Sequence, residues 1–290
     1  MSEPVPEVSV IIPAKNADAT IAEQLEALCR QDTTLTFEVI VVDDQSTDDT
    51  CGAARAFTGR LPSLRLLRTV DRTGHSHGRN VGASHSAGRS LLFLDADDVA
   101  DEGYVQAMGV ALRDSPMVGG MLSPFRTNSR KVSQDSPSLQ SAVSDGMYGW
   151  LPWISAGVLG ISADLFDRLG GFDESLSRTE DPDLGWRASI AGVTMAAVPD
   201  AVLHYRLRAG IRSTFWQSYS NGLEAPLLYK RYRYRGMPRH TARAMIRFWA
   251  GALTRCTRCR TLGDMEGCAA LLGLRVGLLR GSIRHRVMYS

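Results

Sequence analysis

The sequence contains few cysteines and lacks any long uninterrupted apolar run. Its 290 residues include five cysteines, an odd and scattered set, whereas small extracellular domains built on disulfides carry many paired ones. The longest apolar candidate, Cys268–Ile283, is interrupted by Arg275 and Arg280, and a membrane-spanning helix needs about 20 mainly apolar residues. Residues 1–7 also lack the basic and apolar pattern of a secretory signal. We therefore expect a cytoplasmic protein with reduced thiols and no spanning helix.

Two of the cysteines, Cys256 and Cys259, form a C-x-x-C pair, with Cys268 and His285 downstream. Zinc sites use such spacing, but they often combine two pairs. No second pair is present, so we favour free thiols on a helix over a zinc site.

Glycine-rich phosphate loops are also missing. No G-x-G-x-x-G follows the first predicted strand, and no G-x-x-x-x-G-K-[ST] occurs anywhere, which disfavours the ordinary dinucleotide and P-loop classes. The first strand is followed instead by Pro13-Ala14-Lys15-Asn16. A sheet that binds a nucleotide diphosphate without such a loop needs another source of positive charge, and a divalent cation held by carboxylates provides it.

Acidic residues are scarce in the last part of the chain. Residues 206–290 contain 17 Lys+Arg against 3 Asp+Glu, a net charge of +14, whereas residues 1–205 contain 16 against 28, a net of −12. A basic region favours an anionic partner such as a membrane surface, a lipid-linked phosphate or nucleic acid. The alternative is a helical subdomain that packs on the acidic N-terminal part. Lys230–Arg235 alternates basic and aromatic residues as RNA-binding segments do.

Apolar runs alternate with helical patterns over the first 110 residues. The runs at 8–12, 37–42, 64–67 and 91–94 predict buried strands, the first one stopped by Pro13, and the segments 18–30, 46–57 and 78–87 predict helices. Strict alternation indicates right-handed βαβ units and a parallel sheet. Further on we expect strands at 118–125, 193–198 and 201–205, an irregular segment at 126–146, helices at 162–169 and 180–190, and a basic helical region at 215–286.

Carboxylates follow two of the predicted strands directly. Asp43 and Asp44 end one, and Asp95-Ala96-Asp97-Asp98 ends another, at the edge where open α/β sheets bind ligands. Carboxylates this close repel one another unless a cation lies between them, so a metal carrying a phosphate is one interpretation. The other is a solvated turn in which Asp98 or Asp101 caps the next helix.

The order of these motifs resembles that of family 2 glycosyltransferases. The matching segments are Val8–Asn16, Val41–Thr50, Gly78–Gly82 and Phe93–Asp98 on the donor side, and Gly170–Glu174, Thr179–Asp181 and His204–Arg206 on the acceptor side. The resemblance covers residues 8–206. It implies the GT-A fold, an α/β architecture with a Rossmann-like, mostly parallel sheet flanked by helices. On this basis we expect a nucleotide-sugar-binding half at 1–110, an acceptor-binding and catalytic half at 111–210, and a basic helical extension at 211–290.

The resemblance also implies roles on the donor side. Asp44 would hydrogen-bond the base of a UDP-, GDP- or dTDP-sugar, with Pro13 and Ala14 lining the same pocket. Arg79 would lie near the base or the diphosphate. Asp95 would contact the ribose, with Ala96 beside it on the donor side.

The metal and the acceptor involve other positions. Asp97 would bind Mn²⁺ or Mg²⁺, and His204 matches a histidine that joins the metal or diphosphate; a core histidine is the plainer alternative. Asp181 matches the general base, with Glu180 orienting it or the acceptor, although acidic residues also favour a helix N-terminus for electrostatic reasons alone. Displacement at the anomeric carbon with inversion needs such a base and a neutralised leaving group.

The expected activity is therefore inverting, metal-dependent transfer of a sugar to an acceptor hydroxyl. The chain lacks the Gln-x-x-Arg-Trp motif of processive relatives, so we expect one sugar or very few per acceptor. The acceptor would belong to cell-envelope, glycolipid or polysaccharide synthesis, with a lipid-linked molecule as one candidate. The basic C-terminus would contact the inner face of the membrane, and nucleic acid is not expected. The alternatives are a nucleotidyltransferase and a non-catalytic nucleotide-sugar-binding protein.

Overall fold

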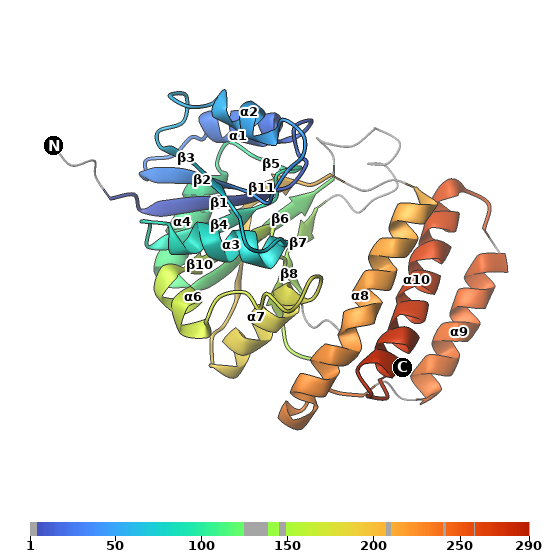
Figure 1. Ribbon diagram of the computed structural model, residues 1–290. Coiled ribbons are helices and arrows are strands. Elements are labelled where there is room, and N and C mark those ends of the chain that lie inside the picture. Colours follow the sequence, from blue (N-terminus) through green and yellow to red (C-terminus); the bar gives the residue numbers. More distant parts are fainter. Residues whose placement is uncertain are drawn as a thin grey trace. The chain divides into compact units, whose positions relative to one another are not determined.

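The computed structural model describes residues 5–124, 139–144, 149–206, 210–239, 242–257 and 259–289, with side chains in the helix at 242–257 described from 247 on except 248 and 253. The chain divides into two compact units (Figure 1). The first comprises Met1–Met147 and Leu151–Leu207, and the second Tyr148–Trp150 and Arg208–Ser290. Most of the irregular segment predicted at 126–146 lies outside the described residues.

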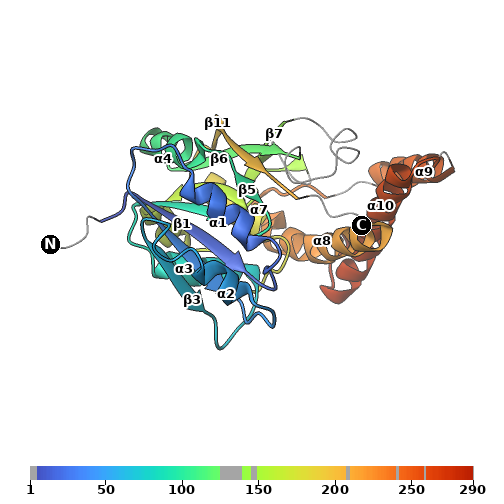
Figure 2. The same cartoon turned by 90° about the horizontal axis from the view of Figure 1, so that it is seen from above.

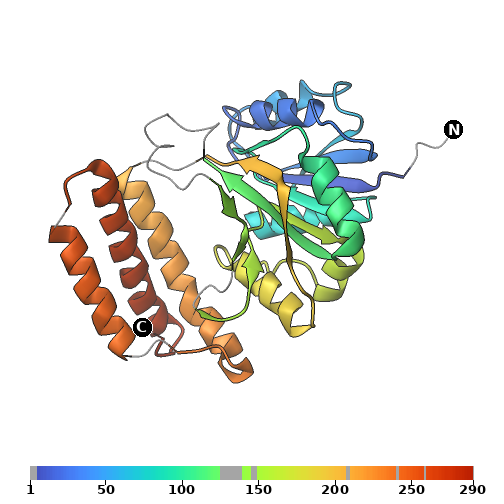
Figure 3. The same ribbon diagram turned by 180° about the vertical axis from the view of Figure 1, so that it is seen from behind.

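The first unit is built on a sheet of nine strands. Its order is β3 (Leu64–Arg68), β2 (Phe37–Asp43), β1 (Val8–Ala14), β4 (Ser90–Leu94), β10 (Val158–Ser162), β6 (Met117–Ser123), β11 (Ala196–His204) and β5 (Val99–Ala100), with β7 (Gln140–Ser141) beside β6. The strands β3, β2, β1 and β4 are mutually parallel, as are β6 and β11, which lie side by side in Figure 3. Among the strands that the structure describes in this sheet, β10, β5 and β7 run antiparallel to their neighbours. The predicted mostly parallel α/β sheet is confirmed.

Two strand predictions were wrong, one in where a strand ends and the other in the number of strands. β1 does not stop before Pro13 but continues to Ala14, with Pro13 in register with Val42 of β2. Proline is tolerated there because the ladder to β4 has already ended at Ile11, so the missing N–H breaks no hydrogen bond on that side. The strands predicted at 193–198 and 201–205 form one strand, β11, with an irregularity between Ala197 and Val202.

The helices of this unit are α1 (Ile21–Cys29), α2 (Thr50–Arg55), α3 (His75–Ser84), α4 (Tyr104–Asp114), α6 (Ala163–Leu169) and α7 (Glu180–Ile190). A small antiparallel pair, β8 (Val143–Ser144) and β9 (Trp153–Ile154), lies apart from the main sheet. The helix α3 packs on β1 and β2. It needs Gly82, because a Cβ at that position would overlap the Ile11 side chain.

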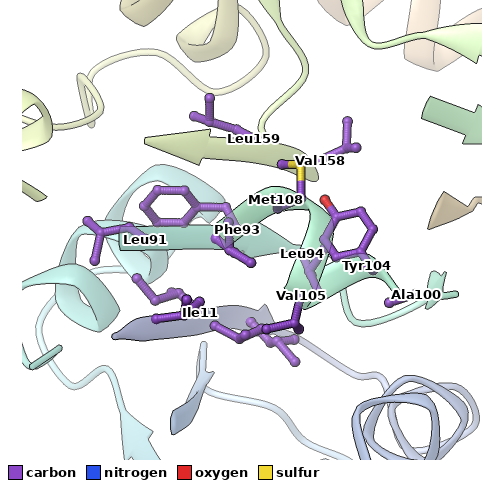
Figure 4. Close-up of a cluster of buried hydrophobic side chains, with 14 of the residues drawn as sticks. Ile11, Leu91, Phe93, Leu94, Ala100, Tyr104, Val105, Met108, Val158 and Leu159 are labelled. Atoms are coloured by element: carbon purple, nitrogen blue, oxygen red, sulfur yellow. The ribbon is translucent and has the colours of Figure 1, made fainter. Parts of the chain in front are cut away.

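The core holds β4 from both faces. Leu91, Phe93 and Leu94 are at most 1% exposed and lie among buried side chains from β1, α4 and β10 (Figure 4). The Phe93 ring also contacts Phe166, with centroids 5.3 Å apart. Because β4 is fixed in this way, the acidic turn that follows it has a defined position at the edge of the sheet.

The second unit is helical, as the sequence predicted. It contains α8 (Ile211–Tyr232), the 3₁₀ turn η2 (Arg233–Arg235), α9 (Ala242–Thr257) and α10 (Leu262–Arg284) (Figure 2). The helices α8 and α10 approach closely, because side chains at Gly273, Gly277 and Gly281 would overlap backbone carbonyls of α8. Among the described residues, no helix combines the length and apolar character that a bilayer crossing demands.

Candidate functional site

Asp44 lies at the end of β2, beside the Pro13–Ala14 end of β1. Its backbone N–H donates to the Ala14 carbonyl at 2.7 Å, which places the two predicted base-contacting segments side by side. The Asp44 carboxylate is 5% exposed and accepts hydrogen bonds from the Gly74 N–H at 3.0 Å and from Lys15 Nζ at 3.3 Å. The pairing of Lys15 with Asp44 was not predicted and comes from the structure.

The acidic turn after β4 is held by a buried glutamine. The Gln24 side chain donates to the Asp95 carbonyl at 3.4 Å and accepts the Ala100 N–H at 2.9 Å. These bonds fix the turn from both ends. Ala96 between them is 7% exposed, and the Asp95 side chain is 39% exposed, so this carboxylate is accessible to a ligand.

Asp98 turns inward and does not cap a helix. The next helix, α4, begins at Tyr104 with Gly103 as its N-cap and no side-chain capping bond, so the capping interpretation of Asp98 and Asp101 is wrong. Asp98 is 8% exposed and accepts the Arg206 N–H at 3.1 Å. Burial, reinforced by the neighbouring carboxylates of the turn, raises the pKa of Asp98 to about 8.

The two predicted metal ligands come from segments that are joined in the sheet. β5 directly follows the acidic turn and pairs with β11 so that Val99 lies opposite His204. Arg206 Nε in addition donates to the Asp97 carbonyl at 3.2 Å. The pairing therefore brings Asp97 and His204 to one edge, although more than 100 residues separate them in the sequence.

The Asp97 carboxylate and the His204 imidazole suit a hard cation whose remaining ligands come from a bound molecule. Within the described ranges, no cluster of three or more His, Cys, Asp or Glu side chains is arranged to hold a metal. A carboxylate and an imidazole are nevertheless donors that Mn²⁺ accepts, and ions of this kind usually take further ligands from substrate phosphates and water. Asp97 and His204 fit a cation that arrives with a diphosphate.

Arg79 connects the acidic turn after β4 to α7, the helix that carries the predicted catalytic residues. Its side chain is 5% exposed, with Nη2 2.8 Å from Asp95 Oδ1 and Nη1 3.3 Å from Glu180 Oε1. The guanidinium also lies over the Phe172 ring, 5.5 Å from its centroid, a cation–π contact. The structure thus places Arg79 between two carboxylates; its predicted contact with a base or diphosphate stays a prediction.

Asp181 stands in the first turn of α7, which begins at Glu180 as predicted. Its Oδ2 accepts the Ala156 N–H at 3.0 Å, while its buried Oδ1 has no hydrogen-bond partner among the residues described. Burial, followed by the charge of Glu180, raises the pKa of Asp181 to about 7. A carboxylate that ionises near neutral pH and keeps one oxygen unpaired has the properties of a general base.

The carboxylate of Glu174 contacts several other residues, and it was given no role from the sequence. Glu174 accepts a hydrogen bond from Asn80 Nδ2 at 3.0 Å, and its other oxygen lies 3.1 Å from His77 Nδ1 and 3.3 Å from Arg72 Nη1. These contacts tie α3 to the loop before α7. The helix predicted at 78–87 begins earlier, at His75, and so includes His77; it follows directly after Gly74, whose φ of 134° suits glycine. The Gly-Arg-Asn and Gly-Gly-Phe-Asp-Glu motifs were the available signals, but nothing in the sequence paired them.

Comparison with known proteins agrees with this arrangement. The model of "Glycosyl transferase family 2" matches residues 9–143. Validoxylamine A glucosyltransferase of Streptomyces hygroscopicus subsp. limoneus is 29% identical over 224 residues, which cover 66% of this chain and 49% of that protein. The poly(ribitol-phosphate) beta-N-acetylglucosaminyltransferase TarS of Staphylococcus aureus is 37% identical over 91 residues, or 31% of this chain and 16% of that protein. The chain spans about half the length of the Streptomyces relative.

Solved structures share the fold at low sequence identity. Residues 1–349 of S. aureus TarS in complex with UDP superpose with a TM-score of 0.57 at 18% identity, covering 98% of this chain and 93% of that one. The mannosyltransferase PcManGT of Pyrobaculum calidifontis, in complex with GDP-Man and Mn²⁺, gives a TM-score of 0.61 at 20% identity, covering 96% and 87%. The family model, the motif order and the sheet topology agree, so residues 9–143 match glycosyltransferase family 2, and the chain shares its fold, of the GT-A type, with these solved glycosyltransferases.

Proposed function

We propose that this chain transfers a sugar from a nucleoside diphosphate donor to an acceptor hydroxyl with inversion, in a metal-dependent reaction. The observation that carries the proposal is the state of Asp181: buried, with Oδ1 unpaired among the described residues and a pKa of about 7. A residue that only stabilised a helix N-terminus would not need an unpaired buried oxygen, which costs free energy to retain. A base needs that oxygen for the acceptor proton.

The donor would lie along the edge formed by the ends of β1, β2 and β4. Asp44 would accept a hydrogen bond from the base, with Pro13 and Ala14 beside it, and Asp95 would receive the ribose. Support comes from the adjacency of Asp44 and Ala14. Fold neighbours were solved with UDP, UDP-GlcNAc and GDP-Man, so uridine and guanosine donors are the first to test, with dTDP-sugars as a third class.

Asp97 and His204 would hold a divalent cation such as Mn²⁺ or Mg²⁺. When bound, the cation supplies positive charge to the leaving diphosphate. The chain's own contribution lies on the opposite side of the sugar: Asp181 accepts the acceptor proton at its free oxygen, and Glu180, held by Arg79 at 3.3 Å, orients the acceptor. Such positioning converts a bimolecular step into an effectively unimolecular one.

We further propose an acceptor of the cell envelope and peripheral contact with an anionic membrane. TarS, one of the relatives, acts by its name on poly(ribitol-phosphate), an anionic polymer. The α10 side chains Met265, Leu272, Val276, Leu279 and Ile283 are each at least 40% exposed. They recur every three to seven residues and form one stripe along the helix. Residues 206–290 as a whole carry a net charge of +14, and an apolar stripe within such a basic region suits the surface of an anionic bilayer.

A thermal-shift screen of UDP-, GDP- and dTDP-sugars with and without Mn²⁺ tests the donor side. A ligand that binds the folded state raises its melting temperature by mass action, so one donor should stabilise the chain more in the presence of Mn²⁺. The same donor should then be slowly hydrolysed by the wild type but not by Asp181→Asn. Binding without any hydrolysis or transfer would favour a non-catalytic nucleotide-sugar-binding protein. The absence of a shift with every donor would refute the proposal.

A further inference from the structure

Three of the five cysteines meet at the turn between α9 and α10. Cys256 lies in the last turn of α9, Cys259 in the connection, and Cys268 in the second turn of α10. The sulfur atoms of Cys259 and Cys268 are 3.0 Å apart, and Cys256 lies close enough to contribute to the raised pKa of Cys268. The sequence singled out the C-x-x-C pair, but only the fold brings Cys268 to it.

The connection that carries Cys259 is held in place by hydrogen bonds. Thr261 and Asp264 form a capping box, with the Asp264 N–H donating to Thr261 Oγ1 at 3.1 Å and the Thr261 N–H to Asp264 Oδ2 at 2.9 Å. The Arg260 N–H donates to the same carboxylate at 3.0 Å. Such a box fixes the entry of the chain into a helix, so the approach of Cys259 to Cys268 is set by the backbone.

A metal does not explain this cluster. Four ligands around zinc, each at about 2.3 Å, place thiolate sulfurs roughly 3.8 Å apart in a tetrahedral site, which is wider than the 3.0 Å between Cys259 and Cys268. In the part of the chain that the structure describes, no three side chains are arranged as a metal site. A disulfide has an S–S bond of about 2.05 Å, so side-chain rotations that close a gap of about 1 Å are sufficient.

We propose that Cys259 and Cys268 form a reversible disulfide bond with each other. The oxidant is a small-molecule disulfide such as glutathione disulfide. The half-exposed Cys259 attacks one sulfur of the oxidant, forms a mixed disulfide and releases one thiolate. Cys268, which is 7% exposed and shielded from the oxidant, then displaces the second thiolate and closes the protein disulfide. Two protein thiols are oxidised, one small disulfide is reduced to two thiols, and the two protein protons pass to the released thiolates or to water.

The order of attack follows from the hydrogen bonds of the cluster. The Cys268 thiol donates its hydrogen to the Cys259 and Cys256 sulfurs, which raises its pKa to about 12, so Cys268 is not the first nucleophile because only thiolates attack. Once Cys259 is part of a mixed disulfide, its sulfur is a weaker acceptor for the Cys268 S–H, and the largest cause of that raised pKa is reduced. The second step then becomes accessible.

The test uses the full chain in glutathione buffers of increasing oxidising strength, followed by alkylation and tryptic mapping. Trypsin separates the three cysteines into peptides 256–258, 259–260 and 261–275, so each pairing has its own mass. We expect the titratable thiols to fall from five to three and the 259–260 peptide to be linked to 261–275. Cys256→Ser should retain this link, and Cys259→Ser should lose it.

The same oxidation in 6 M guanidinium separates the fold from the sequence. The folded chain should reach half-oxidation in a buffer at least tenfold more reducing than the unfolded chain, because the fold holds the two sulfurs together. Retention of all five thiols in the most oxidising buffer would refute the proposal. So would a link from 256–258, or protection of three thiols by added Zn²⁺, since these results would indicate a different pairing or a metal site.

Discussion

Replacement of Asp181 by asparagine should have opposite effects on two properties, the stability of the fold and the transfer activity. The folded chain holds the Asp181 pKa at about 7, whereas an aspartate in an unfolded chain has a pKa of about 3.9. Between these two values the folded state binds more protons than the unfolded state, so the stability of the wild type falls as the pH rises. Asparagine can still accept the Ala156 N–H and carries no charge. We therefore expect Asp181→Asn to be more stable than the wild type at pH 8 and inactive in transfer.

The magnitude follows from the two pKa values. Each tenfold change in proton affinity is worth about 1.4 kcal/mol, so the full difference is about 4 kcal/mol as an upper bound, because relaxation around the charge reduces it. The measurement is urea unfolding of both proteins from pH 4 to pH 8. The free energy of unfolding of the variant, minus that of the wild type, should be smallest near pH 4, increase with pH and level off above pH 7. Titrating groups distant from Asp181 cancel in this difference.

Asp183→Asn is the matched control. Asp183 lies in the same first turn of α7 but is ion-paired with Arg187 at 2.8 Å, so removal of its charge should lower stability at pH 8. Wild-type transfer should increase as the pH rises through 7, when Asp181 loses its proton. A stability difference for Asp181→Asn that stayed constant from pH 4 to pH 8 would refute the assignment of the raised pKa. Normal transfer by Asp181→Asn would refute the role of Asp181 as the base.

Other substitutions test other parts of the site. Asp97→Ala should weaken donor binding in Mn²⁺ at least tenfold, about 1.4 kcal/mol, and leave metal-free binding unchanged; calorimetry with and without EDTA measures both. Arg79→Met should destabilise the fold by about 3–5 kcal/mol in urea unfolding, because it leaves buried Glu180 without its cation; a loss below about 1 kcal/mol would show that the ion pairs are not structural. Ile283→Glu changes a side chain that is 80% exposed, so it should reduce sedimentation with phosphatidylglycerol vesicles about tenfold while the melting temperature stays constant. Equal sedimentation of both proteins would argue against membrane contact through α10.

The sheet could be predicted because buried parallel strands leave a strong signal in the sequence. Every residue of β1, β2 and β4 is buried, so these strands appear as continuous apolar runs. The end of β1 was missed because the effect of Pro13 depends on which neighbouring strand still needs its N–H. The split of β11 was predicted wrongly because its middle residues Pro199 and Asp200 suggest a turn, whereas the strand absorbs them in an irregularity.

The predicted site residues lie where their motifs place them and their roles stay predictions, but the contacts between them were not predicted. Asp44, Asp95 and Asp181 were identified from their motifs, and each lies at the expected end of its element. Nothing in the sequence indicated that a single buried arginine joins two of these motifs. Such long-range pairings depend on the geometry of side chains in three dimensions, and one sequence by itself does not contain that information.

Burial is the largest cause of the raised Asp181 pKa, and the charges around it add to that effect. Asp95, Glu180 and Asp181 approach one buried cation, Arg79, and this single positive charge does not balance three carboxylates. Arg79 makes direct ion pairs with Asp95 and Glu180, whereas its charge lowers the Asp181 pKa by less than burial and the charge of Glu180 raise it. Asp181 is therefore the carboxylate on which the excess negative charge has the largest effect. Removal of Arg79 should raise the Asp181 pKa further, so the residue that pairs with Asp95 and Glu180 also keeps Asp181 ionisable near neutral pH.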